Sequence, residues 1–298
     1  MTSAGRFAPS PSGELHVGNL RTAILAWLFA RSTGRQFLMR VEDLDRARAG
    51  AEAEQLRDLA AIGITWDGDV VRQTDRGTLY AEAISRLSAA GLTYECYCTR
   101  REIQDAPSAP HAPQGAYPGT CRNLSAAERE TKRAVRPAAV RLRSAVTEAE
   151  VQDVLHGSYT GVVDDFVLRR NDGVTAYNLA VVVDDAAQGI DQVVRGDDLL
   201  PSTPRQAYLA SLLNMPVPEY AHVPLVLNAG GARLAKRDGA VTLTDLAAVG
   251  ISVGEVRDGL LASLGLPAGP LERALAVFDP AGLPRDPWIW PGMGGPGA

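Results

Sequence analysis

The fold is decided near the start of the chain, where residues 6–18 read RFAPSPSGELHVG. Residues 5–8 form a short, mildly apolar segment that predicts a strand. Pro9, Pro11 and Gly13 then interrupt regular structure, which indicates a loop. We expect this loop to connect the first strand of a sheet to the helix that follows it.

The next segments predict a helix and a second strand. From Gly18 onward apolar residues recur at the spacing of one helix face, at Leu20, Ile24, Trp27 and Leu28. The helix should end near Gly34, and residues 37–41 are typical of a strand. A strand, a helix and a strand so close together form a βαβ unit, which requires a parallel strand pair and a right-handed crossover.

Later segments extend the same pattern. Residues 51–62 and 78–90 are amphipathic and each ends at a glycine, which predicts two more helices. Residues 163–169 and 174–183 read as strands flanking the turn Asn171-Asp172-Gly173, and residues 203–213 read as a helix. The sequence therefore predicts an α/β fold built on a doubly wound parallel sheet.

We expect four parts along the chain. Residues 1–95 and 161–240 would form the two halves of the main α/β domain, and residues 96–160 would form an insert between them. Residues 105–118 inside this insert are rich in Pro, Ala and Gly without periodicity, which predicts an irregular segment. Residues 241–298 would form a short helical region and a tail.

The composition is that of an ordinary globular protein, with 46% hydrophobic and 22% charged residues. No apolar run is long enough to span a bilayer, and the first residues lack the pattern of a signal peptide. The three cysteines cannot form a closed set of disulfides. These features predict a cytoplasmic protein that does not bind membranes and is a monomer.

The net charge of −5 argues against broad, non-specific adhesion to nucleic acid, although a local basic face could still bind one RNA. Of the 30 basic side chains only two, Lys132 and Lys236, are lysines. A lysine that persists in so arginine-rich a chain indicates a position where a compact, mobile ammonium is needed.

The predicted loop before the first helix suits an anion. A helix N-terminus presents unpaired N–H groups and the positive end of the helix dipole. His16 and Asn19 lie where side chains could donate to phosphate oxygens, and Gly18 would leave room for an adenine or a ribose. The alternative is that His16 caps the helix.

The segment 6–18, followed by Leu20-Arg21-Thr22-Ala23, resembles the opening of the glutamyl-tRNA synthetases of class I, which carry a His-Ile-Gly-His signature. Further resemblance lies in the residue blocks 40–43, 177–185, 194–198 and 202–206. The resemblance implies a Rossmann-type catalytic domain that uses ATP with Mg²⁺. It also implies that His16, Gly18 and Asn19 bind ATP.

Residues 233–237 read RLAKR and follow an apolar segment and the pair Gly230-Gly231. They occupy the position of the Lys-Met-Ser-Lys-Ser loop of these synthetases. The resemblance implies that Lys236 binds ATP and, with His16, acts in catalysis by neutralising the phosphates as pyrophosphate leaves. Arg233 and Ala235 depart from the motif, which predicts weaker or slower loop closure.

A glutamate substrate needs cationic partners for its carboxylate and a carboxylate for its α-ammonium group. The resemblance assigns Arg6 and Arg195 to the first role, Glu42 to the second, and a hydrogen bond to Tyr177. The segment from Phe7 through Ala8 and Pro9 to Ser10 completes the implied glutamate site. The alternative is that Arg6 and Glu42 simply pair with each other.

Three thiols and a phenol lie around the irregular insert, as Cys96, Cys98, Tyr117 and Cys121. Three thiolates and an oxygen can complete a tetrahedral zinc site, although the spacing leaves free thiols equally open. The pattern resembles the zinc insert of the glutamyl-queuosine tRNA(Asp) synthetases, short paralogues of the glutamyl-tRNA synthetases. That resemblance implies one structural Zn²⁺.

The chain ends soon after Lys236, without the large anticodon-reading domain of a conventional glutamyl-tRNA synthetase. The paralogues dock the anticodon loop of tRNA(Asp) and esterify L-glutamate to the cyclopentenediol of its queuosine, and the resemblance implies the same here. Three alternatives stay open: a truncated conventional synthetase, a tRNA-binding paralogue without catalysis, and another nucleotidyltransferase on the same fold.

Overall fold

The computed structural model describes residues 3–104, 117–234 and 241–292. Its main sheet has seven strands, of which all neighbouring pairs are parallel except the last. In spatial order the strands are β3 (Val71–Arg72), β2 (Gln36–Val41), β1 (Ala4–Phe7), β9 (Ile190–Gly196), β10 (Glu219–Val223), β6 (Glu148–Asp153) and β7 (Gly157–Val162).

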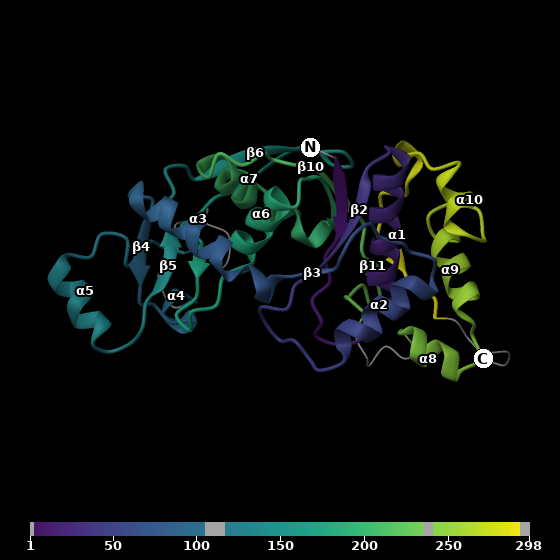
Figure 1. The fold of residues 1–298 in the computed structure, drawn as a ribbon, viewed down its shortest axis with the longest axis horizontal. Coiled ribbons are helices and arrows are strands. Elements are labelled where there is room, and N and C mark those ends of the chain that lie inside the picture. Colours follow the sequence, from purple (N-terminus) through teal and green to yellow (C-terminus); the bar gives the residue numbers. More distant parts are fainter. Residues whose placement is uncertain (1–2, 105–116, 235–240, 293–298) are drawn as a thin grey trace.

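Helices cover both faces of this sheet (Figure 1). On one side lie α1 (Val17–Ser32), α2 (Ala51–Ala61), α8 (Leu243–Ala248), α9 (Val253–Ala262) and α10 (Leu271–Leu275). On the other side lie α3 (Gly77–Ala89), α6 (Tyr177–Ala187) and α7 (Thr203–Leu212). The predicted doubly wound α/β fold is therefore confirmed, with an antiparallel strand at one edge.

Smaller elements complete the molecule. A second sheet at one end joins β4 (Thr93–Cys96), β5 (Ala139–Leu142) and β8 (Val167–Arg169), next to α4 (Arg100–Gln104) and α5 (Ala126–Arg133). Strand β11 (Val226–Leu227) pairs with β12 (Trp288–Ile289). Short 3-10 helices among the described residues are η1 (Gln73–Arg76), η2 (Asp197–Ser202) and η4 (Pro280–Gly282).

Helix α1 is buried on nearly all sides, because the sheet covers one face and α9 and α10 cover the other. Leu20, Ile24 and Leu28, the predicted core face, have no exposed surface. The same core takes in the inner residues of β1 and β2, while a second core lies between the sheet and helices α6 and α7. Burial on both faces rigidly fixes the carboxyl ends of the central strands.

The predicted strand at residues 174–183 is wrong. Residues 177–187 form helix α6, and the chain after the turn at 171–173 makes an isolated bridge between Arg169 and Thr175. A short apolar run cannot be assigned by periodicity when an element is buried on several sides. Seven consecutive residues of this helix, 179–185, are buried.

The predicted insert at 96–160 contains strands β6 and β7, which hydrogen-bond to the edge of the main sheet. Its earlier residues form part of the smaller sheet and its helices. The division of the chain into four parts stays a prediction. Within the described ranges, no helix combines the length and the apolar character that crossing a bilayer would need.

Gly5 lies where β1 passes beneath helix α1, and this contact predicts a stability effect. A Cβ at this position would lie 2.9 Å from the Cβ of Ala30. We expect Gly5→Ala to lower the free energy of unfolding by about 1–3 kcal/mol in urea titration, because the close-packed backbones must separate. Gly77→Ala is the control, since a Cβ there has open space, and equal midpoints for both variants would contradict this prediction.

Candidate active site

A cavity of about 750 Å³ opens at the carboxyl ends of the central strands β1, β2 and β9. This is where open α/β sheets bind their ligands. All of the predicted ATP and glutamate residues that the structure describes line it: Arg6, Phe7, Ala8, Pro9, Ser10, His16, Gly18, Asn19, Glu42, Tyr177 and Arg195. Tyr177 reaches the cavity from the start of helix α6 and not from a strand end.

His16 caps helix α1, as the alternative interpretation of the sequence held. Its Nδ1 accepts hydrogen bonds from the backbone N–H groups of Gly18 (3.1 Å) and Asn19 (3.3 Å). The Asn19 side chain accepts from the His16 backbone N–H in return. Gly18 is required here because a Cβ would lie 2.9 Å from the imidazole. The His16 ring packs against this glycine, which also lines the cavity.

This cap changes how the helix can meet an anion. The N–H of Val17 is also taken, by the carbonyl of Val241 at 2.8 Å, so the first backbone donors of α1 are bonded within the protein. Burial lowers the pKa of His16, so its ring is neutral at pH 7. A neutral imidazole that accepts at Nδ1 carries its proton on Nε2, which is the donor that His16 offers the cavity.

Arg195 lies on β9, and its guanidinium group donates three hydrogen bonds to other side chains. Its Nε donates to Nε2 of His222 (3.0 Å), one terminal nitrogen to Tyr177 Oη (3.3 Å) and the other to Thr203 Oγ1 (2.9 Å). In the part of the chain that the structure describes, these bonds use three of the five N–H donors of the guanidinium. One N–H remains on each terminal nitrogen, and two such donors form the fork that fits a carboxylate.

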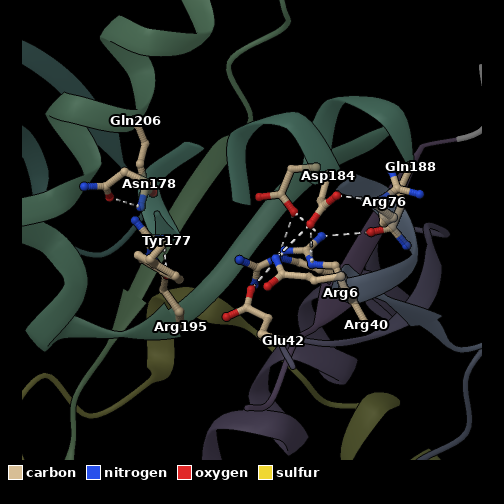
Figure 2. Close-up of polar contacts among 12 residues, drawn as sticks. Arg6, Arg40, Glu42, Arg76, Tyr177, Asn178, Asp184, Gln188, Arg195 and Gln206 are labelled. Atoms are coloured by element: carbon tan, nitrogen blue, oxygen red, sulfur yellow. Dashed lines mark hydrogen bonds and ion pairs between the residues drawn. The ribbon is translucent and has the colours of Figure 1, made fainter. Parts of the chain in front are cut away.

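Arg6 and Glu42 do not pair with each other in the described residues. Arg6 Nε lies 3.4 Å from Asp185 Oδ1, while Glu42 Oε1 lies 3.4 Å from a terminal nitrogen of Arg40. Arg40 also bonds to Asp185 at 2.7 Å and has no exposed surface. Figure 2 shows the side chains of Arg6, Arg40 and Glu42 converging beneath Asp184 of helix α6.

The charges of this network set its chemistry. Burial alone would lower the pKa of Arg40, but the carboxylates of Asp185, Glu42 and Asp184 raise it, so Arg40 is always charged. Burial raises the pKa of Glu42 in spite of its cationic neighbours, Arg40 and Arg6. A bound ammonium group would offset that penalty, so Glu42 is suited to a cationic ligand.

No role was predicted for Arg40, Asp184 or Asp185, although all three lie in the residue blocks that resemble the family. Asp184 also accepts from Gln73, Arg76 and Tyr80, which ties η1 and α3 to helix α6. One signal was available. Arg40 lies on β2 and Glu42 follows directly after the strand, two positions later, so extended backbone directs both side chains to the same face.

Lys236 lies outside the described residues, as do Ala235 and Arg237. The chain on either side is anchored at the cavity. Arg233 pairs with Asp198 and forms a bridge with Leu227, and Thr242 forms a bridge with His16. The described residues on either side of positions 235–240 thus lie near the cavity.

The three cysteines gather at one end of the small sheet, with their sulfur atoms within 4.8 Å of one another. The sulfurs of Cys98 and Cys121 are 3.5 Å apart, and the Tyr117 oxygen lies 3.3 Å from Cys96 and 3.6 Å from Cys98. Zinc–sulfur bonds in a tetrahedral site place sulfurs about 3.8 Å apart. These residues can therefore hold a metal ion.

A second cavity, of about 930 Å³, lies between the metal-ligand cluster and β2. Five arginines line it: Arg46, Arg100, Arg136, Arg141 and Arg170. The two cavities share part of their walls. The residues that line both are Ser10, Ser12, Glu42, Arg46 and Tyr177. A molecule in the second cavity would therefore meet one in the first.

Comparisons with known proteins agree with this geometry. Residues 4–255 match the family described as tRNA synthetases class I (E and Q), catalytic domain. A Nocardia farcinica protein named glutamyl-Q tRNA(Asp) synthetase is 69% identical over 287 residues, which cover 96% of this chain and 92% of that protein. A Cutibacterium acnes protein of the same name is 54% identical, over 89% of this chain and 77% of that protein.

Among solved structures, the chain is similar to the glutamate-tRNA synthetase from Elizabethkingia anophelis, with a TM-score of 0.80 and 26% identity. The match covers 97% of this chain and 68% of that protein. The resemblance that residues 6–18 carried is therefore supported over nearly the whole chain.

Replacement of Arg40 tests the buried network. Arg40→Met should lower the free energy of unfolding at pH 7 by about 3–5 kcal/mol, because buried carboxylates lose their shared cation. The difference in unfolding free energy between Arg40→Met and the wild type should decrease as the pH falls, because protonated carboxyl groups are neutral and no longer need the arginine cation. Arg31→Met, which breaks the half-exposed pair with Asp67, should cost less than about 1 kcal/mol. Urea titrations that gave the two variants equal losses would contradict this account.

Proposed function

This chain belongs to the class I (E and Q) tRNA synthetase family, and from that membership we propose that it activates L-glutamate with ATP and transfers it to the queuosine of tRNA(Asp). The acceptor follows the relatives' name, glutamyl-Q tRNA(Asp) synthetase. One structural observation carries the activation step. A single cavity joins the arginine fork of Arg195, the buried carboxylate of Glu42 and the Nε2 donor of His16 at the start of helix α1.

In the proposed complex the fork of Arg195 binds a carboxylate of glutamate, with Arg6 beside it. Glu42 binds the α-ammonium group, whose charge relieves the cost of burying this side chain. Tyr177 is already bonded to Arg195 and lies at the opening toward the second cavity. Only an amino acid with a second carboxylate can contact the arginines and Glu42 and still present its α-carboxylate for reaction.

ATP would lie against the start of helix α1, with its phosphates facing His16 Nε2 and the Asn19 side chain. We include Mg²⁺ as part of the ATP substrate, where it neutralises phosphate charge. Lys236 is proposed to approach the same phosphates from its anchored loop. An ammonium group there would stabilise the charge that develops on pyrophosphate.

In the first step an oxygen of the glutamate α-carboxylate attacks the α-phosphorus of ATP. The bond from this phosphorus to the bridging oxygen breaks, and pyrophosphate leaves with the electron pair. The product is glutamyl-adenylate, a mixed anhydride. The protein contributes mainly position and charge neutralisation, so no side chain is assigned as a general base.

In the second step a ring hydroxyl of queuosine attacks the acyl carbon of the adenylate. The acyl carbon–oxygen bond to AMP breaks, AMP leaves with the electron pair, and the hydroxyl proton is released. The arginine-lined cavity beside the metal-ligand cluster suits the phosphates of the incoming RNA. Its shared wall with the glutamate cavity would bring the hydroxyl to the anhydride.

We propose that Cys96, Cys98, Cys121 and Tyr117 hold one structural Zn²⁺. Arg141 stacks on the Tyr117 ring, 3.7 Å from its centroid, and this contact holds the phenol beside the sulfurs. Zinc prefers thiolates and forms closed tetrahedral sites of this kind. The ion would order a segment that lies away from both main cores and would shape the wall of the RNA cavity.

Glutamate-dependent exchange between ATP and labelled pyrophosphate tests the activation step. We expect exchange with glutamate in the absence of any tRNA, and with aspartate at less than a hundredth of that rate, since the shorter side chain cannot span the site. Absence of exchange would exclude the proposed enzyme. Exchange that requires tRNA would instead indicate a conventional glutamyl-tRNA synthetase, which the match to the Elizabethkingia anophelis protein also allows.

The acceptor is tested in the same preparation with labelled glutamate. Label should appear on tRNA(Asp) that contains queuosine and should resist removal of the terminal adenosine. tRNA(Asp) without queuosine is the matched control. Labelling of that control or of tRNA(Glu) would contradict the proposed acceptor.

Metal analysis tests the zinc proposal. Protein purified without chelators should contain about one zinc per chain, and Cys121→Ser should lose most of it. Tyr117→Phe should retain the ion but release it at lower chelator concentration. Tyr97→Phe is the control, because its hydroxyl donates to Glu95 and not to the cluster. Less than half an equivalent of zinc in the wild type would count heavily against the site.

A further inference from the structure

A line of buried polar side chains runs from β6, the strand next to the edge of the sheet, to the glutamate cavity. Asp153 ends strand β6, His222 lies on the neighbouring strand β10, and Arg195 lies on β9 beyond it. Asp153 Oδ2 is 2.6 Å from His222 Nδ1, and His222 Nε2 is 3.0 Å from Arg195 Nε. His222 has no exposed surface, and the other two residues are about 5% exposed.

The proton positions along this line follow from the donors. Arginine cannot accept a hydrogen bond, so Arg195 Nε must donate and His222 Nε2 must be the acceptor. His222 Nδ1 then carries the proton and donates it to Asp153. Burial lowers the pKa of His222, which keeps the ring neutral and its Nε2 lone pair available.

Asp153 itself is held in place by the backbone. Its Oδ1 accepts from the N–H groups of Leu155 and His156 at 2.9 and 3.0 Å, so the carboxylate cannot turn away from His222. The bond to His222, acting with those backbone bonds, keeps the pKa of Asp153 low although burial opposes this. The remaining side of His222 packs on the Tyr220 ring, and Thr203 Oγ1 lies 3.0 Å from Nε2.

We propose that Asp153 and His222 are positioning residues for glutamate: Asp153 selects the histidine tautomer whose Nε2 holds Arg195 by its Nε, leaving the terminal nitrogens of Arg195 for the substrate carboxylate. This inference rests on the proposed function. It adds two residues that touch neither glutamate nor ATP. It also explains why a carboxylate is buried at the far side of the histidine.

The role of Arg195 depends on which of its nitrogens is occupied. A guanidinium can meet a carboxylate through its two terminal nitrogens or through Nε and one terminal nitrogen. His222 takes Nε, which removes the second possibility. His222 on β10 therefore orients the two terminal nitrogens of Arg195 in the cavity before any substrate binds.

Asp153→Asn tests the tautomer with almost no change in shape. The amide oxygen can keep the bonds from Leu155 and His156. The amide N–H₂ group then faces His222 Nδ1 and forces the proton to Nε2, and it also gives up the bond that Oδ2 accepts from the His222 backbone N–H at 3.1 Å. Two N–H donors would then face each other across the bond to Arg195. In glutamate-dependent ATP–pyrophosphate exchange we expect KM for glutamate to rise about tenfold to a hundredfold. KM for ATP and kcat should stay within about twofold.

Asp165→Asn is the matched control. Asp165 is equally buried, accepts from Tyr94 and the Ser144 N–H, and lines neither cavity, so its exchange kinetics should equal those of the wild type. A second variant tests whether glutamate binding can be rescued. His222→Gln in the Asp153→Asn background presents an amide oxygen to Arg195, and this acceptor does not depend on a ring tautomer. The double variant should regain most of the lost affinity for glutamate, which a merely structural role would not allow.

Histidine NMR separates this inference from the proposed function. With ¹⁵N-labelled histidine, two-bond proton–nitrogen correlations report the tautomer of each of the four histidines. His222 should be protonated at Nδ1 in the wild type and at Nε2 in Asp153→Asn. A wild-type His222 protonated at Nε2, or an unchanged KM for glutamate in Asp153→Asn, would overturn the inference. Absence of exchange in the wild type would remove the proposed function, and the substrate role of Arg195 with it.

Discussion

The site depends on one buried cation, Arg40, which lies at the carboxyl end of β2 and shares its charge among the carboxylates of Asp184, Asp185 and Glu42. An arginine so deeply buried is stable only with such partners. Because these partners come from both the strand and helix α6, the ion pairs fix how α6 packs on the sheet. The two arginines that face the cavity, Arg6 and Arg195, take their places relative to that contact.

A hydrophobic core surrounds this polar centre on both sides of the sheet. Burial of α1 between the sheet and the last helices is non-directional and would tolerate small shifts. Charge-assisted hydrogen bonds are directional and would not. The molecule therefore combines a general apolar driving force with a few polar contacts that determine the geometry where chemistry is proposed.

Much of this could be predicted from the sequence, because the deciding signals were local. The breaks at Pro9, Pro11 and Gly13 and the periodicity after Gly18 define a βαβ unit within one short segment. The prediction of a strand where helix α6 forms is wrong because the helix is buried on several sides, so its apolar residues do not show the helical spacing. The His222 network could not be found at all, since its members lie 27 and 69 residues from one another and meet only through strand pairing.

Side-chain roles were harder to predict than side-chain positions. The sequence placed His16 at the phosphate end of the cavity, but the backbone amides expected to bind the anion are bonded within the protein. A local pattern shows which groups are near a helix start, whereas the cap that consumes them depends on the rotamer of one ring. The carboxyl-end location of the cavity follows from topology and needed no such detail.

The common wall of the two cavities has a kinetic consequence. If RNA fills the arginine-lined chamber, it stands across one approach to the glutamate pocket, so the small substrates enter first and the nucleic acid follows. The RNA would then cover the glutamyl-adenylate formed in the first cavity, which would shorten the time for which water can hydrolyse this anhydride. RNA in that chamber would also cover one of the routes by which AMP can leave.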